Sequence, residues 1–251
     1  MCKFYDPTGE EISIDQFISN YSKCYFINNN KFVEDRIEEL LIAEQLSAED
    51  VMLILRWKMG RIDAKASQAK NKHNLPEKDV PVSFITYTGR GRKVDATDFC
   101  NKISILSREK KCPRNAEEIW SAFIPDKESS SKINVPENMG TVYLLTVLYF
   151  LSNAEYPIYD RYAKMALDAI ISNGETRPGD VVPYKELPAK TDGGFKSLLK
   201  KSDSKYRVYI DEIETVFRKR YTTNKQNRDI DRALWVYGHL FRDKTTKATP
   251  E

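Results

Sequence analysis

Apolar residues recur at helical spacing along much of the chain, and this pattern predicts a mainly α-helical protein. Residues 32–46 (FVEDRIEELLIAEQL) carry apolar side chains on one helical face, namely Phe32, Val33, Ile37, Leu40 and Leu41. The next segment, residues 47–63, opens with Ser47 and Asp50 in capping-box positions. We therefore expect two amphipathic helices joined by a tight turn in the first third of the chain.

One patch departs from the helical pattern. Residues 80–96 (VPVSFITYTGRGRKVDA) are rich in β-branched and aromatic residues around Gly89 and Gly91. This composition predicts a short β-hairpin near residues 82–94. The GRGR sequence does not follow a strand and open a helix as a phosphate-binding loop does, so we interpret it as the tip of the hairpin.

Five further helices are expected after the hairpin. Residues 115–124 begin with Asn115 as a cap, and residues 141–152 (TVYLLTVLYFLS) are apolar nearly all round, which is typical of a buried helix. A helix over residues 161–172 should stop at Asn173-Gly174. The last two should cover residues 204–221, capped by Ser202 or Asp203, and residues 230–241, capped by Asp229.

The expected fold is therefore mainly α, with at most a short β-hairpin. We expect an N-terminal helical lobe over residues 1–125, which includes the hairpin, and a second lobe over residues 126–251. A single compact domain is the alternative. The chain of 251 residues, 41% of them hydrophobic, is long enough to build either core.

Composition limits the chemistry that the chain can carry. No apolar run reaches the roughly 18 residues of a membrane span, and the N-terminus opens no signal-peptide pattern, so we expect a soluble cytoplasmic protein. The four cysteines form no CxxC pair, and the chain has only two histidines. We therefore expect no metal site and no cofactor, and carboxylates as the catalytic groups of any enzyme.

Charge is distributed unevenly. The net charge is +3, but residues 196–247 hold fourteen Lys and Arg against seven Asp and Glu, which makes this segment +7 and the remainder −4. Such a segment can bind a nucleic acid or another polyanion, or it can simply be a solvated helical face. Both interpretations stay open at the level of composition.

Asp160 is the candidate for chemistry, because of what precedes it. Gly140 is followed by the buried helix, then by a bend at Pro157, and Asp160 comes twenty residues after the glycine, at the head of the next helix. Asp is also among the best N-cap residues, so a purely structural role is the simpler interpretation of Asp160. The two roles are compatible.

Residues 133–167 resemble the helix-hairpin-helix DNA glycosylases of the endonuclease III and 8-oxoguanine glycosylase superfamily, and Arg232–Gly238 (RALWVYG) is similar to a segment of bacterial proteins with a glycosylase-like fold. The resemblance implies a multi-helix glycosylase-like fold, DNA as the partner and Asp160 as the catalytic carboxylate. It also implies phosphate contacts from Gly140 and Thr141. Further phosphate contacts are expected from the basic tract Arg218, Lys219, Arg220, Lys225 and Arg228, and a base pocket from Tyr156 and Tyr159.

The chain differs from the glycosylase pattern at several positions. Where bifunctional members carry the Schiff-base lysine, this chain has Val142, and Lys164 has no equivalence in the motif. The hairpin segment VPENMG lacks the first glycine of the family's turn, and the iron-sulfur cysteines are absent. We therefore expect a monofunctional glycosylase that uses water activated by Asp160.

Two other function classes remain open. The same fold without chemistry would be a nucleic-acid-binding or protein-interaction module, for example in bacterial anti-phage defence, and the altered hairpin favours this alternative. A purely structural helical protein would explain the composition but not the spacing between Gly140 and Asp160.

Overall fold

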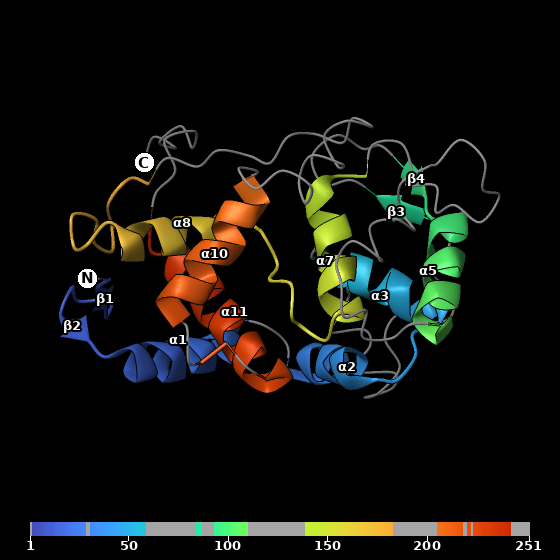
Figure 1. The fold of residues 1–251 in the computed structure, drawn as a ribbon, viewed down its shortest axis with the longest axis horizontal. Coiled ribbons are helices and arrows are strands. Elements are labelled where there is room, and N and C mark those ends of the chain that lie inside the picture. Colours follow the sequence, from blue (N-terminus) through green and yellow to red (C-terminus); the bar gives the residue numbers. More distant parts are fainter. Residues whose placement is uncertain are drawn as a thin grey trace. The chain divides into compact units, whose positions relative to one another are not determined.

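The computed structural model describes residues 2–28, 31–58, 84–86, 93–109, 139–182, 205–217, 220–221 and 223–241. The described part is mainly helical, as expected (Figure 1). Its helices are α1 (Ile14–Asn28), α2 (Lys31–Ile42), α3 (Ala48–Lys58), α5 (Thr97–Glu109), α7 (Thr141–Leu151), α8 (Arg161–Ile171), α10 (Lys205–Phe217) and α11 (Asn224–Gly238). Its strands are β1 (Phe4–Tyr5), β2 (Glu11–Ile12), β3 (Phe84–Thr86) and β4 (Lys93–Asp95).

The chain divides into two compact units that interleave along the sequence. Unit 1 comprises Met1–Asn28, Pro157–Leu187 and Lys205–Glu251, and unit 2 comprises Asn29–Tyr156 and Pro188–Ser204. The expected division at residue 125 does not separate them. The reason is tertiary: α1, near the N-terminus, packs on α11, near the C-terminus, so the two ends of the chain belong to one unit.

Unit 1 is built from the β1–β2 hairpin and helices α1, α8, α10 and α11, with α11 packed against both α1 and α8. Aromatic rings fill its centre. The Phe17 ring lies 5.0 Å from that of Phe4 and 5.1 Å from that of Tyr237, measured between centroids, and the Tyr21 hydroxyl donates to the Tyr5 carbonyl. Burial of such rings is the main source of stability for a core of this kind.

Unit 2 contains α2, α3, α5 and α7, and α3 packs on α5 and α7. The expected capping box is confirmed at the start of α3: Ser47 Oγ accepts from the Asp50 amide, and Asp50 Oδ2 accepts from the Ser47 amide. Helix α7 is buried at nine positions, which confirms the expected internal helix. The Trp57 indole, 6.0 Å from the Phe150 ring, joins α3 to this core.

The hairpin expected near residues 82–94 is confirmed by the antiparallel pairing of β3 with β4, in which Ile85 faces Val94. Its GRGR tip and the helix expected over residues 115–124 lie outside the described residues, as do the caps expected at Ser202 and Asp203. The stop of α8 is confirmed, because Asn173 and Gly174 adopt φ angles of 58° and 89° in the left-handed region.

The expected start of the last helix was wrong, and the expected set of helices and strands was incomplete. Helix α11 does not begin after Asp229; it begins at Asn224, and Thr223 is the cap, accepting through its side chain from the Gln226 amide. The helices α1 and α5 and the β1–β2 hairpin were not expected. In that hairpin Asp6 Oδ1 accepts from the Thr8 and Glu10 amides, so a short side-chain turn closes strands of only two residues each.

Among the helices of the described ranges, none combines the length and hydrophobicity that crossing a membrane requires.

Candidate active site at the start of α8

Asp160 is the N-cap of α8. Its backbone is extended, with φ −127° and ψ 171°, and its Oδ1 accepts from the Ala163 amide at 2.9 Å. The residue is partly exposed, so the carboxylate is held by the first helical turn while remaining accessible to solvent. The expected capping role is confirmed, and the geometry leaves the catalytic role as a prediction.

The three residues before Asp160 are buried and held by α10. The Tyr206 hydroxyl donates to the Pro157 carbonyl at 2.9 Å, and the Tyr209 hydroxyl donates to the Ile158 carbonyl at 3.2 Å. These carbonyls lie in a segment that forms no helix or strand, so the two tyrosines replace the missing backbone partners. They thereby fix the path of the chain into Asp160.

The electrostatics of this region keep Tyr209 protonated. Burial raises the pKa of its hydroxyl well above the usual value, and the nearby carboxylates of Asp231 and Asp160 raise it further. A protonated hydroxyl is a hydrogen-bond donor, as its bond to the Ile158 carbonyl requires. Asp160 therefore lies close enough to α10 to act on its buried tyrosine.

Helix α11 approaches the first turn of α8 closely at Gly238. A Cβ atom at this position would lie 2.0 Å from the carbonyl oxygen of Tyr162. Only glycine permits this approach, and this explains why the RALWVYG segment ends in glycine. The contact is two residues after Asp160, so Gly238 helps to position the turn that carries the carboxylate.

Aromatic side chains cover the same junction of α8 and α11. The His239 ring stacks on Tyr162 with 3.5 Å between centroids and 21° between planes, and it lies 4.0 Å from the Trp235 ring. The Arg161 guanidinium lies 5.9 Å from the centre of the Tyr162 ring. His239 is exposed, and Trp235 and Tyr162 are partly exposed, so this stack reaches the surface next to Asp160.

The two tyrosines proposed for a base pocket lie in different places. Tyr159 is 2% exposed and packs edge-on against Tyr209, with 4.9 Å between ring centroids, so its ring belongs to the core of unit 1. Tyr156 is partly exposed and belongs to unit 2. The partly exposed aromatic ring that lies closest to Asp160 in sequence within unit 1 is Tyr162.

Gly140 and Thr141 begin α7 in unit 2. Gly140 is the N-cap, with an ordinary φ of −68°, and no side chain caps the helix. Thr141 is 5% exposed, so any phosphate contact at this position would involve its backbone amide rather than its hydroxyl. Lys164, on α8, forms ion pairs with Asp168 and Glu212, which engages its amine as an ammonium donor.

Two of the five residues of the basic tract, Arg220 and Arg228, pair with carboxylates. Arg220 forms a two-bond pair with Asp15, at 2.6 and 2.9 Å. Arg228 is 3% exposed, pairs with Asp231 at 2.6 Å and lies 5.4 Å from the centre of the Tyr25 ring. Arg228 was expected to contact a phosphate, but its burial leaves it little surface to do so. Lys225 is exposed, and Arg218 and Lys219 lie outside the residues whose side chains are described.

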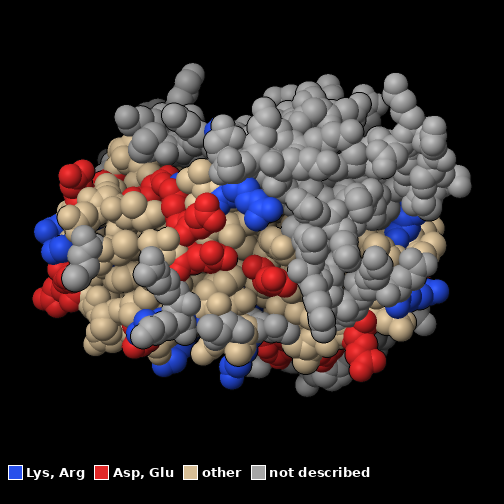
Figure 2. All heavy atoms as spheres, viewed as in Figure 1, with Lys and Arg blue, Asp and Glu red and all other residues tan. Residues whose placement is uncertain are grey.

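Acidic side chains lie on α10, which carries Asp211, Glu212 and Glu214 after Lys205 and Arg207 in its first turn. Figure 2 shows acidic groups gathered over this helix. Asp211 and Glu214 are exposed, so this face repels rather than attracts a phosphate backbone. The positive charge of residues 196–247 is therefore not spread evenly over the segment.

No protein-family model matches the chain, and neither a curated protein nor a solved structure matches it. The resemblance to the glycosylases therefore rests on the residues of the chain itself. Within the described ranges, no group of three or more His, Cys, Asp or Glu side chains is arranged to hold a metal ion.

Sequence reasoning missed the residues that support Asp160. Tyr206 and Tyr209 lie three apart on α10, and this spacing marks one helical face but does not say which segment that face meets. Gly238 lies inside a helical pattern, and a glycine in that position indicates close packing against another segment. The sequence therefore predicts a close contact at Gly238, but it does not predict that the contact is with Tyr162.

Proposed function

We propose that the protein is a DNA-binding N-glycosylase that excises a modified base with Asp160 and a water molecule. The observation that carries the proposal is the placement of Asp160: a partly exposed carboxylate at the N-cap of α8, twenty residues after Gly140, with the buried helix α7 between them. The buried segment before Asp160, anchored by Tyr206 and Tyr209, supplies the rigidity that such a group needs.

The reaction requires no group beyond the carboxylate and water. Asp160 accepts a proton from the water, whose oxygen forms a bond to C1′ of the sugar. The N-glycosidic bond breaks, and its electron pair leaves with the base. The carboxylate also stabilises the positive charge that develops on the sugar before the water adds. Val142 and the ion-paired Lys164 agree with a mechanism that has no lysine Schiff base.

Asp160→Asn is the sharpest test, because Asn is as good an N-cap as Asp and removes only the charge. Wild type and variant are incubated with duplexes that carry a panel of modified bases, and abasic sites are counted. We expect the variant to lose roughly 100-fold or more of the activity while it keeps DNA binding and a free energy of unfolding within about 0.5 kcal/mol of wild type.

Thr223→Ala provides the matched control, since it removes the cap of α11 without touching the carboxylate. It should lower the free energy of unfolding by about 1 kcal/mol and leave activity unchanged at a temperature where the protein is folded. Abasic sites formed equally by wild type and by Asp160→Asn would exclude the proposed role, and Asp160 would then be a cap alone.

A non-catalytic interaction module is the second candidate, and the charge pairing favours it. Two of the arginines expected to bind phosphates already hold carboxylates, and α10 exposes acids. A protein of this kind would bind DNA weakly, with little dependence on salt, and would form no abasic sites. Measuring DNA affinity at two salt concentrations alongside the excision assay separates the two candidates.

A further inference from the structure

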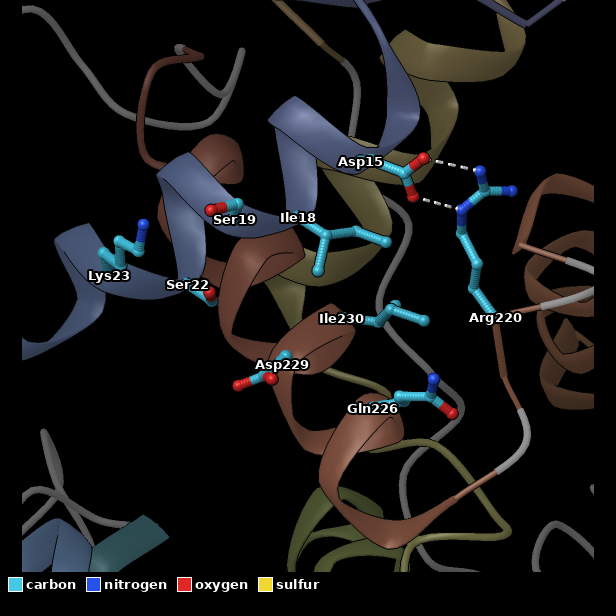
Figure 3. A pocket seen from close by; sticks show the side chains of 9 residues that line it. All are labelled: Asp15, Ile18, Ser19, Ser22, Lys23, Arg220, Gln226, Asp229 and Ile230. Carbon is cyan, nitrogen blue, oxygen red and sulfur yellow. Dashed lines mark hydrogen bonds and ion pairs between the residues drawn. The ribbon is translucent and has the colours of Figure 1, made fainter.

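Unit 1 contains a second site that the proposed function does not use. A pocket of about 430 Å³ opens between α1 and α11, within the size range of small-molecule sites. Figure 3 shows its lining, which is Asp15, Ile18, Ser19, Ser22, Lys23, Arg220, Gln226, Asp229 and Ile230. None of these residues comes from α8, so the pocket does not include Asp160.

One end of the pocket is closed by an ion pair. The Arg220 guanidinium binds Asp15 through two hydrogen bonds and thereby ties the chain before α11 to the first turn of α1. Figure 3 shows Gln226 on the same side of the pocket. The pair neutralises both charges at this end. The Gln226 side chain, whose Oε1 accepts from the Thr223 hydroxyl at 3.0 Å, adds a neutral polar group there.

The other end carries donors that face solvent. Ser22 and Lys23 follow Ser19 by three and four residues, so the three lie on one face of α1. Their hydroxyls and ammonium make no hydrogen bond or ion pair with other residues of the described structure, although Ser22 is only 8% exposed. Two hydroxyls and a cation with no protein partner form a donor set suited to an anion such as phosphate.

Asp229 lies near that end and adds a different property. Its carboxylate is 3.7 Å from the Arg232 guanidinium, which offsets part of its charge. In dinucleotide-binding folds an acidic side chain accepts from a ribose hydroxyl next to the phosphate site.

The middle of the pocket is apolar. Ile18 on α1 and Ile230 on α11 lie between the two polar ends, and Ile230 is 1% exposed. An apolar middle with a polar group at each end fits a ligand whose body is flat or hydrophobic and whose ends are polar.

We propose that this pocket binds a 5′-nucleotide unit. The phosphate lies against Lys23 and the two serines, the ribose hydroxyls donate to Asp229, and the base lies against the two isoleucines with its polar edge toward Gln226. The proposal goes beyond the excision chemistry proposed above and does not depend on Asp160.

Calorimetric titration of the full chain with AMP, GMP, CMP and UMP tests the proposal, with adenosine and inorganic phosphate as separate ligands. We expect at least one nucleotide to bind saturably. Lys23→Glu should weaken that binding roughly tenfold or more, because a charge-assisted hydrogen bond is replaced by repulsion. Ile18→Glu, which puts a carboxylate in the apolar middle, should weaken it by a similar factor.

Lys205→Glu is the matched control, since it reverses an exposed lysine of the same unit outside the pocket. It should bind as wild type does, and so should Asp160→Asn. The proposal is overturned if no nucleotide binds saturably, if Lys23→Glu binds as tightly as wild type, or if adenosine binds as tightly as AMP. Loss of binding in a folded Asp160→Asn variant would also overturn it, because the site would then lie at α8.

Two sources could supply the nucleotide, and a second titration separates them. A single strand with a 5′-phosphate offers the same unit at its end, whereas a strand with a 5′-hydroxyl lacks the phosphate. Preference for the phosphorylated strand over AMP, lost in Lys23→Glu, identifies a strand end as the ligand. Tighter binding of AMP identifies a free nucleotide.

Discussion

Gly238 lies where a single added methyl group would meet the backbone of another helix. Its hydrogen faces the Tyr162 carbonyl, where a Cβ atom would lie 2.0 Å from the oxygen, far inside contact distance. The obstacle is backbone rather than a mobile side-chain end, so relief requires one helix to move. That movement would displace the turn that holds Asp160.

We therefore expect Gly238→Ala to destabilise the protein. Helix propensity alone favours Ala over Gly by about 1 kcal/mol, but overpacking against a backbone costs roughly 1–3 kcal/mol or more, so the net change should be a loss. Urea unfolding measures it. Lys225→Ala, at an exposed position of the same helix, should stay within about 0.5 kcal/mol of wild type. A stabilised Gly238→Ala protein would contradict the close approach.

Asp160 shows how far a single residue can be interpreted from its local sequence. Its capping role was predictable, because an acid after a proline bend and before an amphipathic helix favours an N-cap. Its partial exposure and the buried carbonyls beside it were not, because both depend on α10, which lies more than forty residues further along the chain.

Among the secondary-structure elements, α10 holds the segment before α8 in place through hydrogen bonds. Its buried tyrosines, Tyr206 and Tyr209, donate to carbonyls of a stretch that forms no helix or strand. The same helix places Lys205 and Arg207 in its first turn and acids further on, against the direction that the helix dipole favours. The contacts of α10 with unit 1, rather than its intrinsic preference, therefore account for its stability.

Tyr206→Phe should lower the free energy of unfolding by about 1–3 kcal/mol, because it leaves the buried Pro157 carbonyl without its donor while the ring still fills the core. Chemical denaturation measures the loss. Val208→Ala, on the exposed side of α10, should change the stability by less than about 0.5 kcal/mol. Equal stability of Tyr206→Phe and wild type would show that the hydrogen bond contributes nothing.

The start of α11 illustrates why element boundaries are harder to predict than elements. The apolar pattern of residues 230–241 marks the buried half of the helix, and Asp229 precedes it as a plausible cap. The first turns of α11 are polar, although Asn227 and Arg228 in them are buried, so the hydrophobic period does not reach the start of the helix. Thr223 with Gln226 three residues later was the better signal.

At the scale of the whole molecule, buried tyrosines link the stability of unit 1 to pH. Burial is the main cause of the raised pKa of Tyr21, Tyr209 and Tyr237, each above the ordinary value of 10.0. Below pH 10 the hydroxyls are protonated in both folded and unfolded states, and their contribution to stability is fully present. Above it the unfolded state releases protons that the folded state keeps, and the contribution is lost as pH rises.

We therefore expect the free energy of unfolding to fall above about pH 10, by up to about 1.4 kcal/mol per pH unit for each such tyrosine. Urea unfolding from about pH 8 to about pH 11 measures the slope, and tyrosinate absorbance should show that these groups ionise only on unfolding. Tyr237→Phe should reduce the slope. A stability that stays constant through this range would contradict the burial of the three hydroxyls.

Local patterns in the chain predict the helical class, the buried helix α7, the capping box of α3, the β3–β4 hairpin and the stop of α8. Each of these follows from a local period or from a cap and turn within a few residues, and local rules suffice for it. The spacing of Gly140 and Asp160 can likewise be found in the sequence, and the hypothesis of a glycosylase follows from that spacing.

Which of these elements share a core depends on contacts that local patterns do not contain. The tertiary structure put the first 28 residues with the last helices, made core residues of Tyr159 and Arg228, and paired Arg220 with Asp15 to close a pocket. The physical reason is that these contacts join positions far apart in the chain. Packing between distant segments, rather than the pattern within any of them, determines whether a charged or aromatic side chain is buried or reaches solvent.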